Sequence, residues 1–166
     1  VEISGDPGDI PAIQGLRASV QDQGSFLVSK AFIDIPLDED DFWLDLCAGP
    51  GGKSALLDRW AKERNIDFVA NEISPHRAKL MQRSTDQIVL SDGLVPAFRE
   101  ESFTRILVDA PCSGLGALRR RPDSRWRKKS AEINELVSIQ NGLLEKASQL
   151  IKVGGLLGYV TCSPHP

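Results

Sequence analysis

The chain has 166 residues, of which 41% are hydrophobic and 26% are charged, a composition typical of globular domains that excludes an intrinsically disordered chain. No apolar run approaches the ~18 residues that a membrane span needs. The formal net charge of −3 argues against a generally basic nucleic-acid-binding protein, although it is compatible with a local basic patch. The three cysteines lack the CxxC spacing of structural zinc sites, so we expect no metal and a reduced, cytoplasmic setting.

Strand-like and helix-like segments alternate along most of the chain. Residues 1–40 contain several prolines and one predicted helix near Gly24–Phe32, and we interpret them as a lead-in segment. The short apolar runs that predict strands are Phe42–Leu46, Phe68–Asn71, Ile88–Leu90, Arg105–Val108 and Leu156–Thr161. The amphipathic runs that predict helices between them are Ser54–Arg64, Pro75–Ser84 and Ala131–Lys152.

Strands this apolar, alternating with helices, predict an α/β domain whose mostly parallel sheet is covered on both faces. Local signals indicate helix ends. Ser74 followed by Pro75 is a typical helix start, Ser130 can cap the long helix, and Gly154 is suited to a left-handed helix stop.

The two ends of the chain suggest a piece of a longer protein. Val1 stands in a polar stretch where an initiator Met is absent, and Pro166 follows a strong strand directly. Leu156–Val160 is apolar on both faces, which predicts a strand inside a sheet and not at its rim. We therefore expect the sheet to be incomplete at its C-terminal end, and the isolated piece to self-associate through this open strand edge.

A glycine-rich loop follows the first strand. The segment Leu44-Asp-Leu-Cys-Ala-Gly-Pro-Gly-Gly-Lys53 runs from an apolar strand into three glycines and then opens a helix. Glycines let the backbone approach a ligand closely, and the free N–H groups at a helix start favour anionic groups. Two kinds of nucleotide site are compatible with this pattern.

The first alternative is a P-loop. Gly52–Ser54 matches the end of that motif, and Asp109 ends a strand that resembles the magnesium-holding acidic strand. However, the motif requires a glycine where the chain has Cys47, and Pro50 lacks an N–H donor for the phosphate cradle.

The second alternative is a Rossmann-type cofactor site across the strand ends. Such a site predicts an acidic residue ~20 positions beyond the glycines that accepts hydrogen bonds from ribose hydroxyls. Glu72 lies 20 residues after Gly52, at the end of the second strand. Asp92 follows the third strand, where it could reach an adenine edge, and Asp109 ends the fourth. A plain strand–turn–helix with solvated acidic caps would also account for these carboxylates.

Two cysteines follow strand ends on the same predicted edge of the sheet. Cys112 comes shortly after the fourth strand and Cys162 ends the fifth. A single free cysteine is most often a small buried hydrophobe. Two at one ligand-binding edge, with Asp109 beside the first, instead indicate nucleophilic chemistry, for which the cation of Lys53 could activate a thiolate.

A basic segment follows the first of these cysteines. It is either a solvated loop leading into the long helix or a track for a phosphate backbone beside the active site. Its candidate RNA-binding residues are Arg119, Arg120, Arg121, Arg125, Trp126, Arg127, Lys128 and Lys129.

Three motifs together resemble those of the Fmu/Sun-type RNA cytosine-C5 methyltransferases. They are the glycine loop Leu44–Lys53, the Pro-Cys motif in Asp109–Gly114 and the Thr-Cys motif in Thr161–Ser163. The segment Val20–Ser25 also resembles the stretch that precedes the first motif in that family. The resemblance implies a Rossmann-like class I methyltransferase fold and methyl transfer from S-adenosylmethionine to C5 of cytosine in RNA, with 16S ribosomal RNA as the expected substrate.

The resemblance also implies roles for individual residues. Cys162 resembles the nucleophile that attacks C6 of the cytosine, and Cys112 the cysteine that assists release of the methylated base. Asp109 and Lys53 would act beside them at the base and the cofactor. The residues that would hold the cofactor are Cys47, Ala48, Gly49, Pro50, Gly51, Gly52, Lys53, Glu72, Asp92 and Asp109.

The chain departs from the family pattern in two respects. Family members continue beyond the Thr-Cys motif with further strands and usually carry an upstream RNA-binding domain, so we assign residues 41–166 to a methyltransferase domain whose C-terminal strands are missing. Ala48 and Gly49 stand where Ala-Ala is commoner. The alternatives that remain are a P-loop-like nucleotide-binding protein and a non-catalytic RNA-binding fragment that relies on the basic segment.

Overall fold

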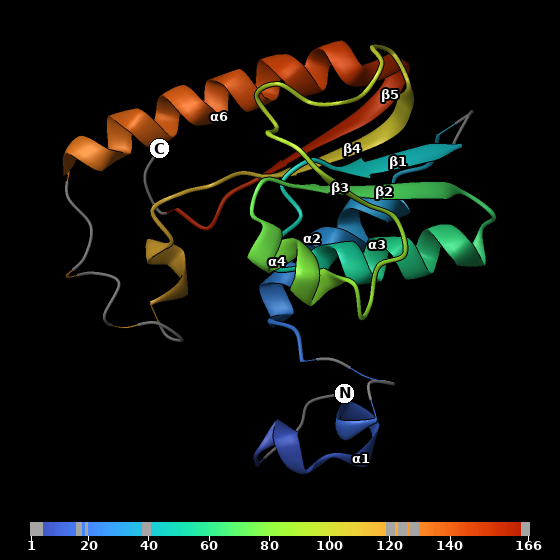
Figure 1. Cartoon of the computed structure of the whole chain (residues 1–166), viewed down its shortest axis with the longest axis vertical. Helices are drawn as coiled ribbons and strands as arrows, with labels where there is room; N and C mark the ends of the chain where they lie inside the picture. The colour runs from blue at the N-terminus through green and yellow to red at the C-terminus, as the bar shows by residue number, and fades with distance from the viewer. Residues whose placement is uncertain are drawn as a thin grey trace.

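The computed structural model describes residues 5–15, 18, 20–37, 41–118, 122, 126 and 130–163. These residues form a five-stranded parallel sheet in the order β3-β2-β1-β4-β5 with helices on both faces (Figure 1). The chain therefore starts in the middle of the sheet and winds outward in both directions. Parallel sheets of this kind bind ligands at the carboxyl ends of their strands, near the point where the order reverses between β1 and β4.

All five predicted strands are confirmed, and several extend beyond their predicted ends. Their bounds are β1 (Phe42–Asp45), β2 (Asp67–Glu72), β3 (Ile88–Leu90), β4 (Phe103–Asp109) and β5 (Ile151–Val160). The predicted α/β class with a doubly covered parallel sheet is therefore confirmed, because the apolar runs are buried from both sides.

The helices connect these strands and cover them. The longer helices are α2 (Gln23–Asp34), α3 (Gly52–Glu63), α4 (Pro75–Met81) and α6 (Ser130–Leu150). Short helical turns are η1 (Pro7–Asp9), α1 (Pro11–Gln14) and η2 (Leu115–Ala117). In Figure 1, α2, α3 and α4 lie below the sheet and α6 lies above it. The predicted cap of α4 is present, since Ser74 accepts a hydrogen bond from the Arg77 amide, whereas the Ser130 side chain lies outside the described part of the chain.

Two hydrophobic cores result, one on each face of the sheet. Successive residues of β1 point to opposite faces, so Trp43 packs with α2, α3 and α4 while Leu44 packs with α6. The strand and helix side chains of both cores are almost completely buried. Each helix thus covers its face of the sheet with an apolar stripe, which holds the strand ends in fixed register.

The transition from α6 to β5 differs from the prediction. The helix ends at Leu150, and Ile151, predicted to be helical, already pairs with Phe103 of β4. Gly154 has a φ of +83°, but it lies within β5, where the pairing jumps from Phe103–Ile151 to Arg105–Leu156. The left-handed glycine therefore lies at a bulge in a strand and does not form the helix stop that was predicted, since one type of β-bulge also places a glycine at positive φ.

The strand β5 is the end strand of the sheet among the described residues. Leu156 packs into the core beneath the sheet and Leu157 into the core above it, as expected for a strand that is apolar on both faces. Self-association through this strand stays a prediction.

No helix in the described part of the chain combines the length and apolar character that crossing a membrane requires.

A buried arginine ties the lead-in segment to the sheet. Arg105 of β4 is only 2% exposed and donates hydrogen bonds to the carbonyl oxygens of Phe32 (2.7 Å) and Ile35 (2.5 Å) at the C-terminal end of α2. Its guanidinium also lies 5.4 Å from the ring centre of Trp43. The carbonyls at a helix end need such partners, so Arg105 fixes α2 against the sheet. The predicted boundary at residue 40 itself stays a prediction.

We expect Arg105→Leu to lower the free energy of unfolding by about 2–4 kcal/mol, because it leaves buried carbonyl groups without a donor. Denaturant titration of the intact protein measures this. Arg59→Leu is the matched control, since the exposed Arg59 pairs with the exposed Glu63 one turn away and its loss should change stability by no more than about 0.5 kcal/mol. Equal effects of the two substitutions would show that Arg105 does not anchor the helix.

Candidate active site

The candidate site lies at the carboxyl ends of the central strands. Asp45, Glu72 and Asp109 are the last residues of β1, β2 and β4, and the two loops that carry Cys112 and Cys162 continue from β4 and β5. The residues predicted from sequence to form the site, other than the basic segment, therefore gather at one edge of the sheet.

The glycine loop joins β1 to α3 in a tight turn. The amide of Ala48 donates to the carbonyl of Asn71 (2.9 Å), and that of Gly51 donates to the carbonyl of Ala48 (2.8 Å). Gly51 has a φ of +103° and precedes the first residue of α3. A Cβ atom at Gly49 would collide with the carboxylate of Glu72. The loop conformation therefore depends on glycine at both positions.

Cys47 within this loop behaves as a structural residue. Burial, together with the negative charge of Asp45, raises the pKa of its thiol to about 12. A thiol with that pKa remains protonated at neutral pH and is a poor nucleophile.

Glu72 supports the glycine loop. Its Oε2 accepts a hydrogen bond from the Gly49 amide (2.8 Å), while its Oε1 accepts from the Ser74 amide (2.7 Å) and pairs with Arg77 (2.7 Å). The side chain is only 2% exposed. The structure thus places Glu72 beside the glycines, as its spacing predicted, but with the chain's own donors on both oxygens. Its contact with a ribose stays a prediction.

The other predicted contact at this end, Asp92, is exposed beyond β3. Its Oδ1 accepts a hydrogen bond from the Leu94 amide (2.9 Å), which closes a turn.

Nearby, the amide group of Asn71 donates to the carbonyls of Leu46 (3.0 Å) and Ser91 (3.1 Å) and so joins the ends of the first three strands.

Asp45 is a buried carboxylate that the sequence analysis missed. Its Oδ2 accepts a hydrogen bond from the Ser54 hydroxyl (2.7 Å), whereas its Oδ1 has no hydrogen-bond partner in the described structure. Burial raises the pKa of Asp45 to about 7, although the Ser54 hydrogen bond opposes this shift. Its position at the end of β1, before the glycines, was the available signal. A buried acceptor without a partner is suited to a donor on a bound ligand.

The raised pKa of Asp45 makes stability depend on pH. Because the folded pKa lies above the ordinary 3.8, the unfolded state loses its proton first, and this contribution to stability is lost as pH rises from about 4 to 7. We expect the wild-type protein to lose up to about 4 kcal/mol over this range relative to Asp45→Asn, which carries no such charge. Denaturant titrations of both proteins at pH 4, 5.5 and 8 measure this difference. Parallel stability curves would contradict the assignment.

An ion pair links the glycine-loop helix to β4. The ammonium group of Lys53, in the first turn of α3, lies 2.6 Å from Oδ2 of Asp109. Both side chains are partly shielded from solvent, with exposed fractions of 14% and 32%. The two residues predicted to act together are therefore in direct contact.

The two predicted catalytic cysteines are also in contact. The sulfur atoms of Cys112 and Cys162 lie 3.0 Å apart, close enough to share a proton. Burial raises the pKa of Cys112, but hydrogen bonds to its thiolate from Cys162 and Thr161 outweigh burial and lower the pKa below its ordinary value. Burial, the hydrogen bond to Cys112 and the charge of Cys112 raise the pKa of Cys162 to about 11. Cys112 is therefore the more acidic of the two thiols.

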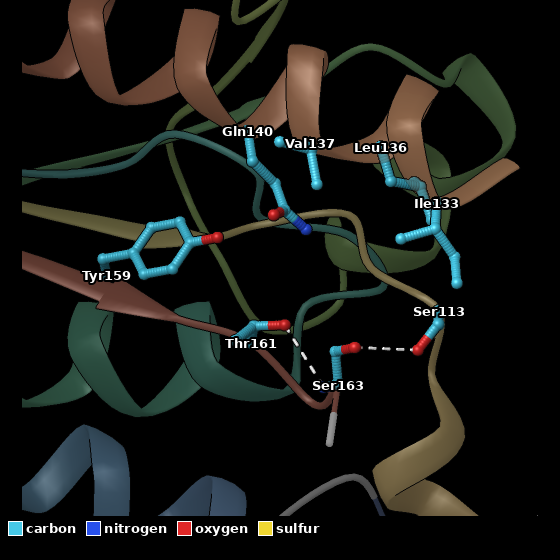
Figure 2. A pocket seen from close by; sticks show the side chains of 8 residues that line it. All are labelled: Ser113, Ile133, Leu136, Val137, Gln140, Tyr159, Thr161 and Ser163. Carbon is cyan, nitrogen blue, oxygen red and sulfur yellow. Dashed lines mark hydrogen bonds between the residues drawn. The ribbon is translucent and has the colours of Figure 1, made fainter. Parts of the chain in front are cut away.

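A cavity of about 170 Å³ lies beside the cysteine loops, between α6 and β5 (Figure 2). Its polar side is formed by Ser113, Gln140, Tyr159, Thr161 and Ser163, and its apolar side by three residues from the first half of α6, namely Ile133, Leu136 and Val137. The serines and the threonine that line it flank the two cysteines in sequence. The cavity is thus lined by residues of the two loops that carry the thiols.

The predicted RNA-binding segment is only sparsely described. Trp126 is highly exposed, with 83% of its surface accessible. The predicted cationic residues of this segment, Arg119, Arg120, Arg121, Arg125, Arg127, Lys128 and Lys129, lie outside the described residues. Its interaction with RNA stays a prediction.

Residues 33–166 match the sequence model of the 16S rRNA methyltransferase RsmB/F family. The chain belongs to this family. The match includes the glycine loop and both cysteine motifs, and it confirms the resemblance to Fmu/Sun-type enzymes that those motifs indicated.

Curated relatives agree with the family. The Mycobacterium tuberculosis protein MT1451 (strain CDC 1551 / Oshkosh) is 46% identical over 166 aligned residues, which cover 97% of this chain and 36% of that protein. The ribosomal RNA small subunit methyltransferase B of Shewanella oneidensis is 32% identical, covering 97% of this chain and 38% of that protein. The chain thus spans little more than a third of the length of these two relatives.

Solved structures share the fold. The crystal structure of PH0851 superposes with a TM-score of 0.85 at 29% identity, covering 96% of this chain and 37% of that one. A geranyl diphosphate C-methyltransferase from Streptomyces coelicolor, solved with S-adenosyl-L-homocysteine, superposes with a TM-score of 0.56 at 15% identity, covering 95% of this chain and 53% of that one. The predicted Rossmann-like class I methyltransferase fold is therefore confirmed.

Proposed function

We propose that this RsmB/F-family protein transfers a methyl group from S-adenosylmethionine to C5 of a cytosine in RNA, through a covalent bond between Cys162 and C6 of the base. The expected RNA is 16S ribosomal RNA, in keeping with the family's description. The observation that carries the proposal is the contact between the thiols of Cys112 and Cys162, 3.0 Å apart beside Asp109 and Lys53. We also propose a cytoplasmic location, because the three cysteines are free thiols and a reducing compartment keeps thiols free.

The strand ends fit the proposed cofactor. The glycine loop of residues 47–53 brings the backbone close to a ligand, the unpaired Oδ1 of Asp45 can accept from an ammonium group, and Asp92 is exposed for a donor on the base. Glu72 would hold the glycine loop in place through the Gly49 amide and would also accept a hydrogen bond from the ribose of the cofactor. When bound, S-adenosylmethionine supplies an electrophilic methyl group on a sulfonium.

The thiol pair explains how cytosine C5 can become reactive. C5 of cytosine is a weak nucleophile until a thiolate adds to C6 and makes it enamine-like. As the sulfur of Cys162 attacks C6, its proton can pass to the thiolate form of Cys112, because the two sulfurs lie 3.0 Å apart. The Lys53–Asp109 ion pair lies beside this centre, where it can hold the base edge in place.

The later steps require a proton acceptor and a leaving thiolate. A base must remove the proton from C5 after methylation, and the bond from C6 to Cys162 then breaks to release the methylated cytosine and restore the thiolate. Cys112 is within reach of that sulfur, so we assign it to this release. The target base must also leave its stack or come from single-stranded RNA.

The two alternatives are less well supported. In a P-loop, the lysine would reach phosphates, whereas Lys53 is paired with Asp109 at 2.6 Å and Pro50 offers no N–H donor. A non-catalytic RNA-binding fragment would give strongly salt-dependent RNA affinity but would not account for two thiols in contact at a cofactor edge.

Substitution of Glu72 tests the cofactor site. We expect Glu72→Ala to weaken binding of S-adenosylmethionine by about 1–3 kcal/mol, because it removes the acceptor of the Gly49 amide and the proposed ribose contact. Calorimetric titration of the cofactor measures this. Glu63→Ala, at the exposed end of α3, is the control and should leave the affinity unchanged. Unchanged affinity of a stable Glu72→Ala protein would exclude Glu72 from the site.

Covalent trapping tests the proposed reaction. An RNA that carries 5-azacytosine at the target position should form a stable adduct with the wild-type protein in the presence of S-adenosylmethionine, visible as a shifted band in a denaturing gel. We expect the adduct to map to Cys162 by peptide mass spectrometry. A protein that binds S-adenosylmethionine and RNA but forms no adduct would contradict the covalent mechanism.

A further inference from the structure

The two cysteine motifs lie side by side beyond the ends of their strands. The last paired residues of β4 and β5 are Asp109 and Val160, yet the Ala110 amide still donates to the Val160 carbonyl (2.9 Å) and the Gly116 amide to the Cys162 carbonyl (2.7 Å). A Cβ atom at Gly116 would lie 2.6 Å from that carbonyl oxygen, so the close approach requires glycine. The two loops therefore continue the contact that the strands begin.

This arrangement pairs like residues across the two loops. Cys112 faces Cys162, and the following residues, Ser113 and Ser163, face each other with their hydroxyl oxygens 2.9 Å apart. Figure 2 shows the two serine side chains pointing toward one another below α6, and both line the cavity there, whereas the cysteines do not. The serine pair thus joins the two loops next to the cysteine pair.

Other contacts fix each loop, and the Gly116–Cys162 backbone hydrogen bond joins the two loops four residues beyond Cys112. Gln140 of α6 donates to the Pro111 carbonyl (2.8 Å), which holds the first loop to the helix. The Ser163 amide donates to the Thr161 hydroxyl (3.2 Å) within the second loop. Neither of these two contacts spans the loops, whereas the Ser113–Ser163 hydrogen bond joins the residues that directly follow the two cysteines and adds to the Gly116–Cys162 backbone hydrogen bond.

We propose that the Ser113–Ser163 hydroxyl pair is a positioning device that sets the distance between the thiols of Cys112 and Cys162. A hydrogen bond weakens steeply once its atoms move outside contact range, so a drift of about 1 Å between the loops would uncouple the thiols. The proposal rests on the proposed function in one respect, because it takes the two thiols to be catalytic. Neither serine touches the reacting atoms.

The charged and titratable groups near the two thiols also influence their pKa values. Burial is the largest cause of the raised pKa of Cys162, and the charge of Asp109 adds to it. Burial and then the charge of Cys112 raise the pKa of Tyr159. Lys53 is held by Asp109. A change at the serines leaves these groups in place, so its effect on the thiols reports their separation.

Thiol alkylation in the intact protein tests the proposal without any substrate. The rate of modification of Cys112 by iodoacetamide, located by peptide mass spectrometry, is measured against pH for the wild type, Ser113→Ala, Ser163→Ala and the double variant. We expect the midpoint to move upward by about 0.5–1 pH unit in each single variant, because the thiolate loses its donor. The double variant should show no larger shift than either single variant, because each single substitution already removes the one hydrogen bond between the two serines.

Two further variants separate positioning from folding. Ser163→Thr keeps a hydroxyl at the half-buried position and should restore the wild-type midpoint. Ser148→Ala removes a hydroxyl that donates to Glu145 on the exposed face of α6 and should leave the midpoint unchanged. Lower melting temperatures of Ser113→Ala and Ser163→Ala with an unchanged midpoint would show that the serines only stabilise the loops, and would overturn the proposal.

The outcomes also distinguish this proposal from the proposed function. If the serine variants shift the midpoint while the wild-type protein forms no RNA adduct, the positioning device stands and the proposed function fails. If the wild-type protein forms the adduct and the single variants keep both its midpoint and its rate of adduct formation, the proposed function stands and the positioning device fails.

Discussion

Cys162→Ala should abolish methyl transfer to RNA, lowering the rate by about four orders of magnitude or more, because it removes the nucleophile that activates the base. Binding of S-adenosylmethionine should remain nearly unchanged, since the Cys162 thiol contacts Cys112 and the cofactor would be held at the glycine loop. Single-turnover transfer of labelled methyl groups, with calorimetry of the cofactor on the same preparation, measures both quantities.

The control for this substitution is the cofactor affinity itself. A variant that binds the cofactor as well as the wild type has an intact loop at residues 47–53, so its loss of activity must arise at the thiol. Near-normal turnover of Cys162→Ala would show that the nucleophile is assigned to the wrong cysteine.

Cys112→Ala should have a different effect and accumulate a stable protein–RNA adduct on ordinary RNA. Burial is the largest cause of the raised pKa of Cys162, and the hydrogen bond and the charge of Cys112 add to it. Removing Cys112 therefore lowers the pKa of Cys162, and its proton can pass to solvent as it attacks. Release should fail, because the group that assists departure of Cys162 is gone. Denaturing gels after incubation with unmodified RNA and S-adenosylmethionine measure the adduct.

The two cysteine variants give a paired test. Cys162→Ala should form no adduct, and the double variant should behave as Cys162→Ala does. Equal adduct formation by both single variants, or none by Cys112→Ala, would reverse or remove the roles assigned here.

The sheet and the location of the site were predictable from local patterns. The apolar runs around Leu44, Val69 and Ile106 predicted buried parallel strands, and the structure buries all three. Because parallel strands end at the same edge, the positions of Asp109 and Cys162 in the sequence were enough to place them together. The ion pair of Lys53 with Asp109 follows from the same geometry.

The remaining features depend on tertiary contacts that no local pattern records. Leu150 and Ile151 are both apolar, and only the pairing of Ile151 with Phe103 ends the helix between them. Arg105 has the sequence environment of a strand interior, and its role depends on α2 packing beside it. The hydrogen bond between Ser113 and Ser163 likewise joins residues 50 positions apart.

The position of the transferred methyl group on the RNA decides whether the protein methylates C5 of cytosine. The intact protein is incubated with 16S ribosomal RNA and S-adenosylmethionine labelled in the methyl group, and the RNA is digested to nucleosides and analysed by mass spectrometry. We expect the label to appear in 5-methylcytidine and to depend on Cys162. Label on another nucleoside, or on the protein alone, would contradict it.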